Sequence, residues 1–189
     1  MTRNEEEWQR TFNDYCRYFD DCALAGIEIV VYHPGNAVPS PEEREVCMQT
    51  SIAHTRLLVE ECKKRGLTLA LENMPNGLCR TASEAARMLI AVPELKFCFD
   101  TNHLLRNTHE DFIKTVAHRI VTTHISDFDF VTEKHWFPLQ GQINWRKVIE
   151  VFDAVGYTGP FVYETMPMGH TWEDVRPNFD YLLSLKEEL

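Results

Sequence analysis

The chain has 189 residues, of which 44% are hydrophobic and 25% charged, enough for one globular domain with a sizeable core. Its formal net charge of −10 would repel phosphate backbones, so we expect no nucleic acid as a partner. The six cysteines are scattered without a C-x-x-C pair, and we find no leader sequence and no long apolar run. Together these features predict a cytoplasmic protein without a membrane partner.

Six amphipathic segments predict helices, and a glycine follows three of them as a stop signal. Ser40 and Thr81 each begin a capping box with a glutamate three residues later. We expect Thr171 and Asp174 to cap the last helix, with Pro177 kinking it or delaying its start. The predicted helices span residues 4–25, 40–65, 81–92, 109–117 and 144–155, with the sixth beginning near 171–174.

Short apolar runs between these helices predict five strands. The runs cover residues 27–32, 67–71, 95–99, 120–123 and 161–163. Each run ends at a residue whose side chain can bind a metal. Polar residues of this kind break a strand. These five residues are His33, Glu72, Asp100, His124 and Glu164.

The alternation of strands and helices predicts an α/β fold with parallel strands. The carboxyl ends of parallel strands open onto one face, so the five polar residues should gather in one pocket. Three carboxylates and an imidazole suit Mn²⁺, Mg²⁺, Co²⁺ or Zn²⁺, and the sequence pattern offers no thiolate that would favour a soft metal. Two glutamates on different strands also suggest a proton-transfer pair beside a metal-bound hydroxy-ketone, through a metal-stabilised enediolate.

These strand ends resemble those of the xylose-isomerase-like TIM barrels, and more narrowly the sugar phosphate isomerase/epimerase family. A glycine-containing loop at residues 138–145 resembles the family's loop before its penultimate helix. The family includes the ketose 3-epimerases and hydroxypyruvate isomerase. The matching segments are Val31-Tyr32-His33-Pro34-Gly35, Leu71-Glu72-Asn73, Phe99-Asp100-Thr101-Asn102-His103, His124-Ile125-Ser126-Asp127 and Tyr163-Glu164.

The resemblance implies an isomerase or epimerase that acts on a sugar or a sugar-like hydroxy-ketone with one divalent ion, Mn²⁺ before Mg²⁺, Co²⁺ or Zn²⁺. Glu72 and Glu164 would be the acid/base pair and, with Asp100 and His124, the metal ligands. His103 would contact substrate oxygens. The remaining implied pocket residues are His33, Asn73, Asp127 and His135.

Two departures from the family pattern matter. A full barrel has eight strands, whereas residues 1–189 read as a single partial TIM-barrel domain of about five parallel strands with alternating helices. Aligned by motif, the first three strands are missing, so either the chain is a truncated gene product or a partner chain or a dimer covers the open barrel edges. Of the partners, we expect a homo-oligomer. The ketose 3-epimerases also place an arginine shortly after the histidine ligand, where this chain has Phe128-Asp129-Phe130.

Two other interpretations remain open at this point. The chain could be a catalytically inactive truncated barrel that only binds metal or sugar. Its resemblance also extends to endonuclease IV, a metal-dependent nuclease with three zinc ions. The nuclease interpretation ranks lower, because the chain is acidic and has too few evident ligands for three ions.

Overall fold

The computed structural model describes residues 4–35, 40–166 and 169–185. Its five strands form one parallel sheet in the order β1-β2-β3-β4-β5. The strands are β1 Ile29–Tyr32, β2 Thr68–Glu72, β3 Lys96–Asp100, β4 Ile120–Ile125 and β5 Phe161–Tyr163. The helices are α1 Glu5–Leu24, α2 Pro41–Lys64, α3 Ala82–Ala91, α4 His109–Val116, the 3-10 turn η1 Ala117–Arg119, α5 Trp145–Ala154 and α6 Val175–Ser184.

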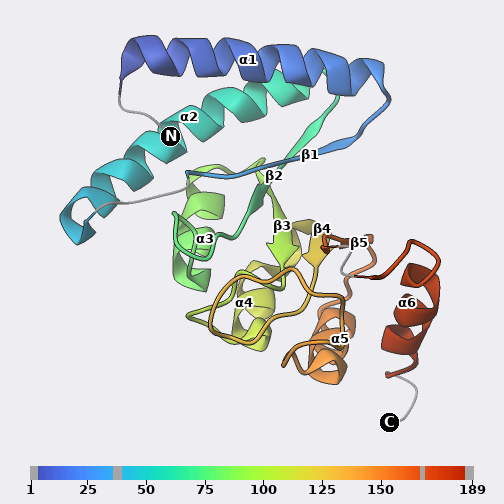
Figure 1. Cartoon of the computed structure of the whole chain (residues 1–189). Coiled ribbons are helices and arrows are strands. Elements are labelled where there is room, and N and C mark those ends of the chain that lie inside the picture. Colours follow the sequence, from blue (N-terminus) through green and yellow to red (C-terminus); the bar gives the residue numbers. More distant parts are fainter. Residues whose placement is uncertain (1–3, 36–39, 167–168, 186–189) are drawn as a thin grey trace.

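The sheet curls into an arc with the helices along its outer side, which confirms the predicted incomplete TIM barrel (Figure 1). Neighbouring helices pack on one another in chain order, α1 on α2 and then α3 through α6. The strand order follows the chain order because each helix returns the chain to start the next parallel strand. All strand carboxyl ends therefore point to one side of the arc.

The two faces of the arc carry different residues, because side chains alternate along a strand. Leu69, Leu71, Phe97 and Phe99 are buried in the hydrophobic core, and by alternation they share the helix-covered face. The opposite, concave face takes the intervening positions, and at the strand ends these are polar. The apolar core thus holds the sheet rigid while the concave face remains available for a site.

Most predicted element boundaries agree with the structure. Ser40 Oγ accepts a hydrogen bond from the Glu43 backbone N–H at 3.2 Å, and Thr81 Oγ1 accepts one from Glu84 at 3.3 Å. The second half of the box at Thr81 does not form, because the Glu84 carboxylate pairs with Arg44 instead.

Two predicted details were wrong. The first strand begins at Ile29, because the Ile27 backbone N–H donates to Cys22 at the end of α1 and so belongs to the helix cap. Asp174 occupies the N-cap position of α6 without a capping bond, and its carboxylate accepts from the Thr171 backbone N–H at 2.8 Å. Pro177 lies in the first turn of α6, where its missing N–H leaves no helical bond unmade.

The sheet is open at both sides within the described residues. Strands β1 and β5 each pair with one neighbour only. Val162 on β5 is exposed, and the three residues that begin β1 are only partly buried. Within the parts of the chain that the structure describes, no helix has the length and apolar character needed to cross a bilayer.

Candidate metal centre and active site

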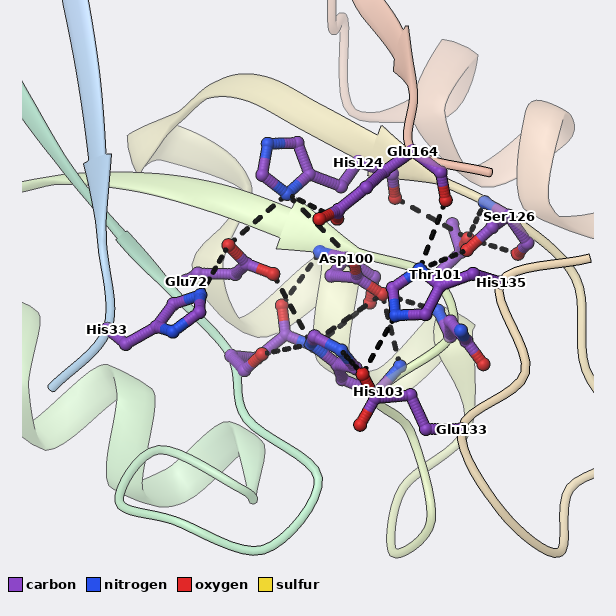
Figure 2. Close-up of polar contacts among 12 residues, drawn as sticks. His33, Glu72, Asp100, Thr101, His103, His124, Ser126, Glu133, His135 and Glu164 are labelled. Carbon is purple, nitrogen blue, oxygen red and sulfur yellow. Dashed lines mark hydrogen bonds and ion pairs between the residues drawn. The ribbon is translucent and has the colours of Figure 1, made fainter. Parts of the chain in front are cut away.

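Four predicted ligands converge at the carboxyl end of the sheet. Ligand atoms of these four side chains all lie within 4.8 Å of one another (Figure 2). Asp100 and His124 are register partners on β3 and β4, which places their side chains on the same face. The four residues are Glu72, Asp100, His124 and Glu164.

His124 stands at the middle of this group. Its Nδ1 atom lies 2.9 Å from Glu164 Oε2, 3.2 Å from Glu72 Oε2 and 4.0 Å from Asp100 Oδ2. His124 Nδ1 has no hydrogen-bond partner of acceptable geometry, and neither has Asp100 Oδ2, although both atoms are buried. Buried polar atoms are rarely left unpaired in native proteins. Two such atoms 4.0 Å apart, with two further carboxylates beside them, fit the donor set of a divalent cation.

The loop after β3 is built around Asp100. Its other carboxylate oxygen, Oδ1, accepts hydrogen bonds from the backbone N–H groups of Asn102 at 2.6 Å and His103 at 3.1 Å. The side-chain amide of Asn73 pairs with both backbone groups of Asp100, each at 2.9 Å. One oxygen therefore orients the carboxylate while the other stays available for a cation.

Burial and imidazole contacts shift the pKa values of the carboxyl groups in opposite directions. Burial raises the pKa of Asp100 to about 7, although the nearby His103 charge opposes the rise. Burial also opposes ionisation of Glu72, but the adjacent imidazoles of His103, His124 and His33 outweigh burial and lower the pKa of Glu72. The adjacent His124 imidazole lowers the pKa of Glu164. Crowded charges of this kind are typical of functional sites.

Two further predicted residues contact Glu72. His33 Nε2 lies 3.2 Å from Glu72 Oε2, and the His33 side chain is half exposed. His103 is buried, and its Nδ1 lies 2.9 Å from the Asn73 carbonyl oxygen and 3.3 Å from Glu72 Oε1. The His103 Nε2 atom has no hydrogen-bond partner of acceptable geometry. Both imidazoles thus border the four-residue group.

The loop after β4 adds a second group of ligand-type atoms beside the first. Ligand atoms of His103, Glu133 and His135 lie within 4.8 Å of one another. Glu133 Oε1 lies 2.8 Å from His135 Nε2 and 3.3 Å from His103 Nε2. His135 Nδ1 also contacts the Glu164 carbonyl oxygen at 3.1 Å. The sequence analysis missed Glu133, although its place two residues before His135 was a usable signal.

The sequence pattern offered no thiolate for the centre, but the structure places one thiol beside it. Ligand atoms of Glu72, Cys98 and His124 lie within 4.8 Å of one another. Burial raises the pKa of the Cys98 thiol to about 12, while a hydrogen bond with His124 opposes the rise. No role at the centre was predicted for Cys98, although the alternation Cys98-x-Asp100 is a signal for a shared face.

Asp127 organises the loop before α5. Its Oδ1 accepts hydrogen bonds from the backbone N–H groups of Phe128 at 2.8 Å and Ile143 at 3.1 Å. Its Oδ2 accepts hydrogen bonds from the Leu139 backbone N–H at 3.0 Å and from the Trp145 indole N–H at 2.8 Å. These four donations occupy the carboxylate. A Cβ on Gly141 would clash with Asp127 Oδ1 and with the Phe128 carbonyl oxygen. The glycine-containing loop therefore folds against a buried acceptor.

An arc of parallel strands with its polar residues at the carboxyl ends is the arrangement of the (β/α)-barrel class. The family model described as xylose isomerase-like TIM barrel matches residues 1–185, and the chain belongs to this family. A comparison with curated protein sequences gives no match.

Solved structures share the fold at low sequence identity. A D-tagatose 3-epimerase-like protein is 20% identical, with a TM-score of 0.85 over 98% of this chain and 72% of its own. The 3-keto-D-glucoside 4-epimerase from E. coli is 16% identical, with a TM-score of 0.80 over 97% of this chain and 74% of its own. The IOLI protein with a bound zinc atom is 16% identical, with a TM-score of 0.84 over 97% and 72% of the two chains.

Proposed function

We propose that the protein is a metal-dependent isomerase or epimerase of a sugar or a sugar-like hydroxy-ketone. The observation that carries the proposal is the approach of Glu72, from β2, and Glu164, after β5, to the same His124 Nδ1 atom, at 3.2 and 2.9 Å. Two carboxylates on different strands can face a substrate from two directions. The sugar epimerases among the structures with the same fold support this choice of reaction.

The metal would be one divalent ion held by Glu72, Asp100, His124 and Glu164. Three carboxylates and an imidazole suit Mn²⁺ first, and also Mg²⁺, Co²⁺ or Zn²⁺. When bound, such an ion polarises a substrate carbonyl and acidifies the adjacent C–H bond. The unpaired, buried Asp100 Oδ2 supports the assignment, because a cation would supply its missing partner.

The two glutamates would move the substrate proton. One carboxylate takes the proton from the carbon beside the carbonyl, and the C–H electron pair shifts into the carbonyl to give an enediolate. The other carboxyl group then returns a proton, to the opposite face of that carbon in an epimerase or to the former carbonyl carbon in an isomerase. In the isomerase the hydroxyl proton also moves from the first carbon's oxygen to the former carbonyl oxygen. The Glu164 side chain is 48% exposed and that of Glu72 is 2% exposed, so the substrate would enter from the Glu164 side.

Three imidazoles would contact the substrate. His103 presents its unpaired Nε2 beside the metal ligands, and His33 and His135 border the same space from β1 and the loop after β4. Neutral or charged imidazoles donate to hydroxyl oxygens. Asn73 and Asp127 are fully engaged with protein groups and would position the loops rather than touch the substrate.

The proposal is tested by incubating the protein with Mn²⁺ and a panel of ketoses and hydroxypyruvate in deuterated water. We expect metal-dependent deuterium incorporation at the carbon beside the carbonyl, and its loss in Glu164→Gln. Glu150→Gln, on the outer helix α5, is the matched control and should keep wild-type exchange. A wild-type protein that binds one metal but exchanges nothing across the panel would be an inactive barrel, and the enzyme proposal would fail.

Metal stoichiometry separates this proposal from a nuclease-like reaction. The group of His103, Glu133 and His135 brings additional ligand-type atoms beside the centre, which a hydrolase with several ions would require. The net charge of −10 disfavours a nucleic-acid substrate. Several ions per chain together with cleavage of abasic DNA would replace the isomerase proposal.

A second copy of the chain would cover the open edges of β1 and β5, since unpaired strand edges invite association. We therefore propose a homo-oligomer, which a molar mass of one chain in solution at micromolar concentration would contradict. The cysteines are all free in the structure, in keeping with a proposed cytoplasmic location.

A further inference from the structure

Cys98 lies beside two of the proposed metal ligands, Glu72 and His124, on the concave face of the sheet. It is the register partner of Glu72 on the neighbouring strand, and it precedes Asp100 by two residues on β3. Both relations put its side chain on the same face as theirs. The residue is fully buried. A small apolar side chain would fill this position, so the thiol beside two ligand residues calls for a chemical explanation.

The thiol joins the centre geometrically. Its sulfur lies within 4.8 Å of a ligand atom of Glu72 and of His124, and those two atoms are equally close to each other. Glu72 and His124 also belong to the group of four proposed metal ligands. Asp100, which is completely buried, leaves its Oδ2 unpaired 4.0 Å from His124 Nδ1. Two unpaired, buried atoms, Asp100 Oδ2 and His124 Nδ1, therefore belong to the centre that Cys98 adjoins.

We propose that Cys98 is an additional metal ligand, which with Glu72 and His124 forms a deeper binding position selective for Zn²⁺ or Co²⁺ over Mn²⁺ and Mg²⁺. This inference rests on the proposed function, because it shares two ligands with that centre. When the ion binds, the thiol proton leaves to the solvent and a sulfur lone pair forms the bond. Thiolate ligands favour borderline and soft ions, whereas carboxylates alone favour the hard ions.

No other cysteine of the described residues takes part in such a group. The ligand-type groups among residues 4–35, 40–166 and 169–185 contain Cys98 and none of the other five thiols. Cys47, on α2, is half buried and serves as a matched control. An effect that follows from the thiol itself should therefore be confined to Cys98.

The test is the absorption spectrum of the Co²⁺-loaded protein. We expect a thiolate-to-cobalt charge-transfer band in the near ultraviolet for the wild type and for Cys47→Ser, and no such band for Cys98→Ala or Cys98→Ser. Competition between Zn²⁺ and Mn²⁺ should shift by roughly 10-fold or more toward Mn²⁺ in the Cys98 variants, a change typical of residues that support a metal site.

The wild-type spectrum alone can overturn the inference, whether or not the variants fold. Bound Co²⁺ without a charge-transfer band means that the centre exists with oxygen and nitrogen ligands only, and the Cys98 inference fails while the proposed function stands. A wild-type protein that binds no Co²⁺, Zn²⁺ or Mn²⁺ overturns both.

Discussion

The side-chain amide of Asn73 pairs with the backbone N–H and carbonyl of Asp100, both at 2.9 Å, and so links the ends of β2 and β3. Both hydrogen bonds of the Asn73 carboxamide go to the Asp100 backbone and not to a proposed ligand side chain. It nevertheless fixes the backbone from which the Asp100 carboxylate projects. The amide is thus a positioning group for the metal centre.

Asn73→Ala should weaken metal binding without removing a ligand. We expect a loss of about 10- to 100-fold in affinity, the usual effect of residues that orient metal ligands. Calorimetric titration with Mn²⁺ measures this loss. Equal affinity of Asn73→Ala and wild type would remove the positioning role.

Metal removal should lower thermal stability. A ligand at 100 times its dissociation constant stabilises the native state by about 2.7 kcal/mol. In a chain of this size, that corresponds to a fall of about 5–10 °C in melting temperature after chelation. Differential scanning calorimetry with and without chelator checks the shift. A melting temperature that is indifferent to chelation would contradict a metal bound in the native state.

Asp127→Ala should destabilise the fold strongly, because it leaves four buried or half-buried donors without their acceptor. We expect a loss of about 3–5 kcal/mol in the free energy of unfolding. Trp145→Phe removes only the indole donor and should cost about 1–2 kcal/mol. Urea denaturation measures both values, and equal effects of the two substitutions would argue against the proposed role of the carboxylate.

We expect His109 to make the free energy of unfolding depend on pH. Burial lowers its pKa to about 4, with the hydrogen bond to the Thr101 carbonyl opposing the change. The unfolded chain then binds the proton first as the pH falls. The contribution of His109 to the free energy of unfolding is therefore fully present above pH 6.5. It is lost as the pH falls toward 4, by about 3 kcal/mol.

His109→Gln keeps a donor for Thr101 and removes the titration, so its unfolding free energy should fall less between pH 6.5 and 4 than that of the wild type. His118, an exposed residue on η1, provides the control His118→Gln. Urea denaturation across this pH range measures all three proteins. If the unfolding free energies of His109→Gln and wild type decline in parallel as the pH falls, His109 does not cause this pH dependence.

The sequence predicted much of the fold because the local signals agree with the tertiary packing. Apolar runs of strand length alternate with capped amphipathic helices, and this alternation allows few arrangements other than a parallel α/β sheet. The strand-end position of Asp100 and His124 followed from the same pattern. Periodicity could also place Cys98 on the Asp100 face, but composition alone gave a buried cysteine no role beyond packing.

The loop after β4 was less predictable. Neither strand nor helix periodicity governs it, and its path depends on the hydrogen bonds of one buried carboxylate, Asp127. The approach of Glu133 to His103 depends on that path, across 30 residues of sequence. Sequence spacing carries no information on the contact between Glu133 and His103, so the structure was needed to find it.

The central claim is that four side chains at the carboxyl ends of the strands form one metal centre, and Asp100→Asn tests it most directly. Asparagine keeps the oxygen that accepts from Asn102 and His103 and replaces only the unpaired Oδ2 by an amide nitrogen. Calorimetric titration with Mn²⁺ should give one ion per chain for the wild type and an affinity lower by about 100-fold or more for Asp100→Asn. Equal affinities in the two proteins would contradict the account.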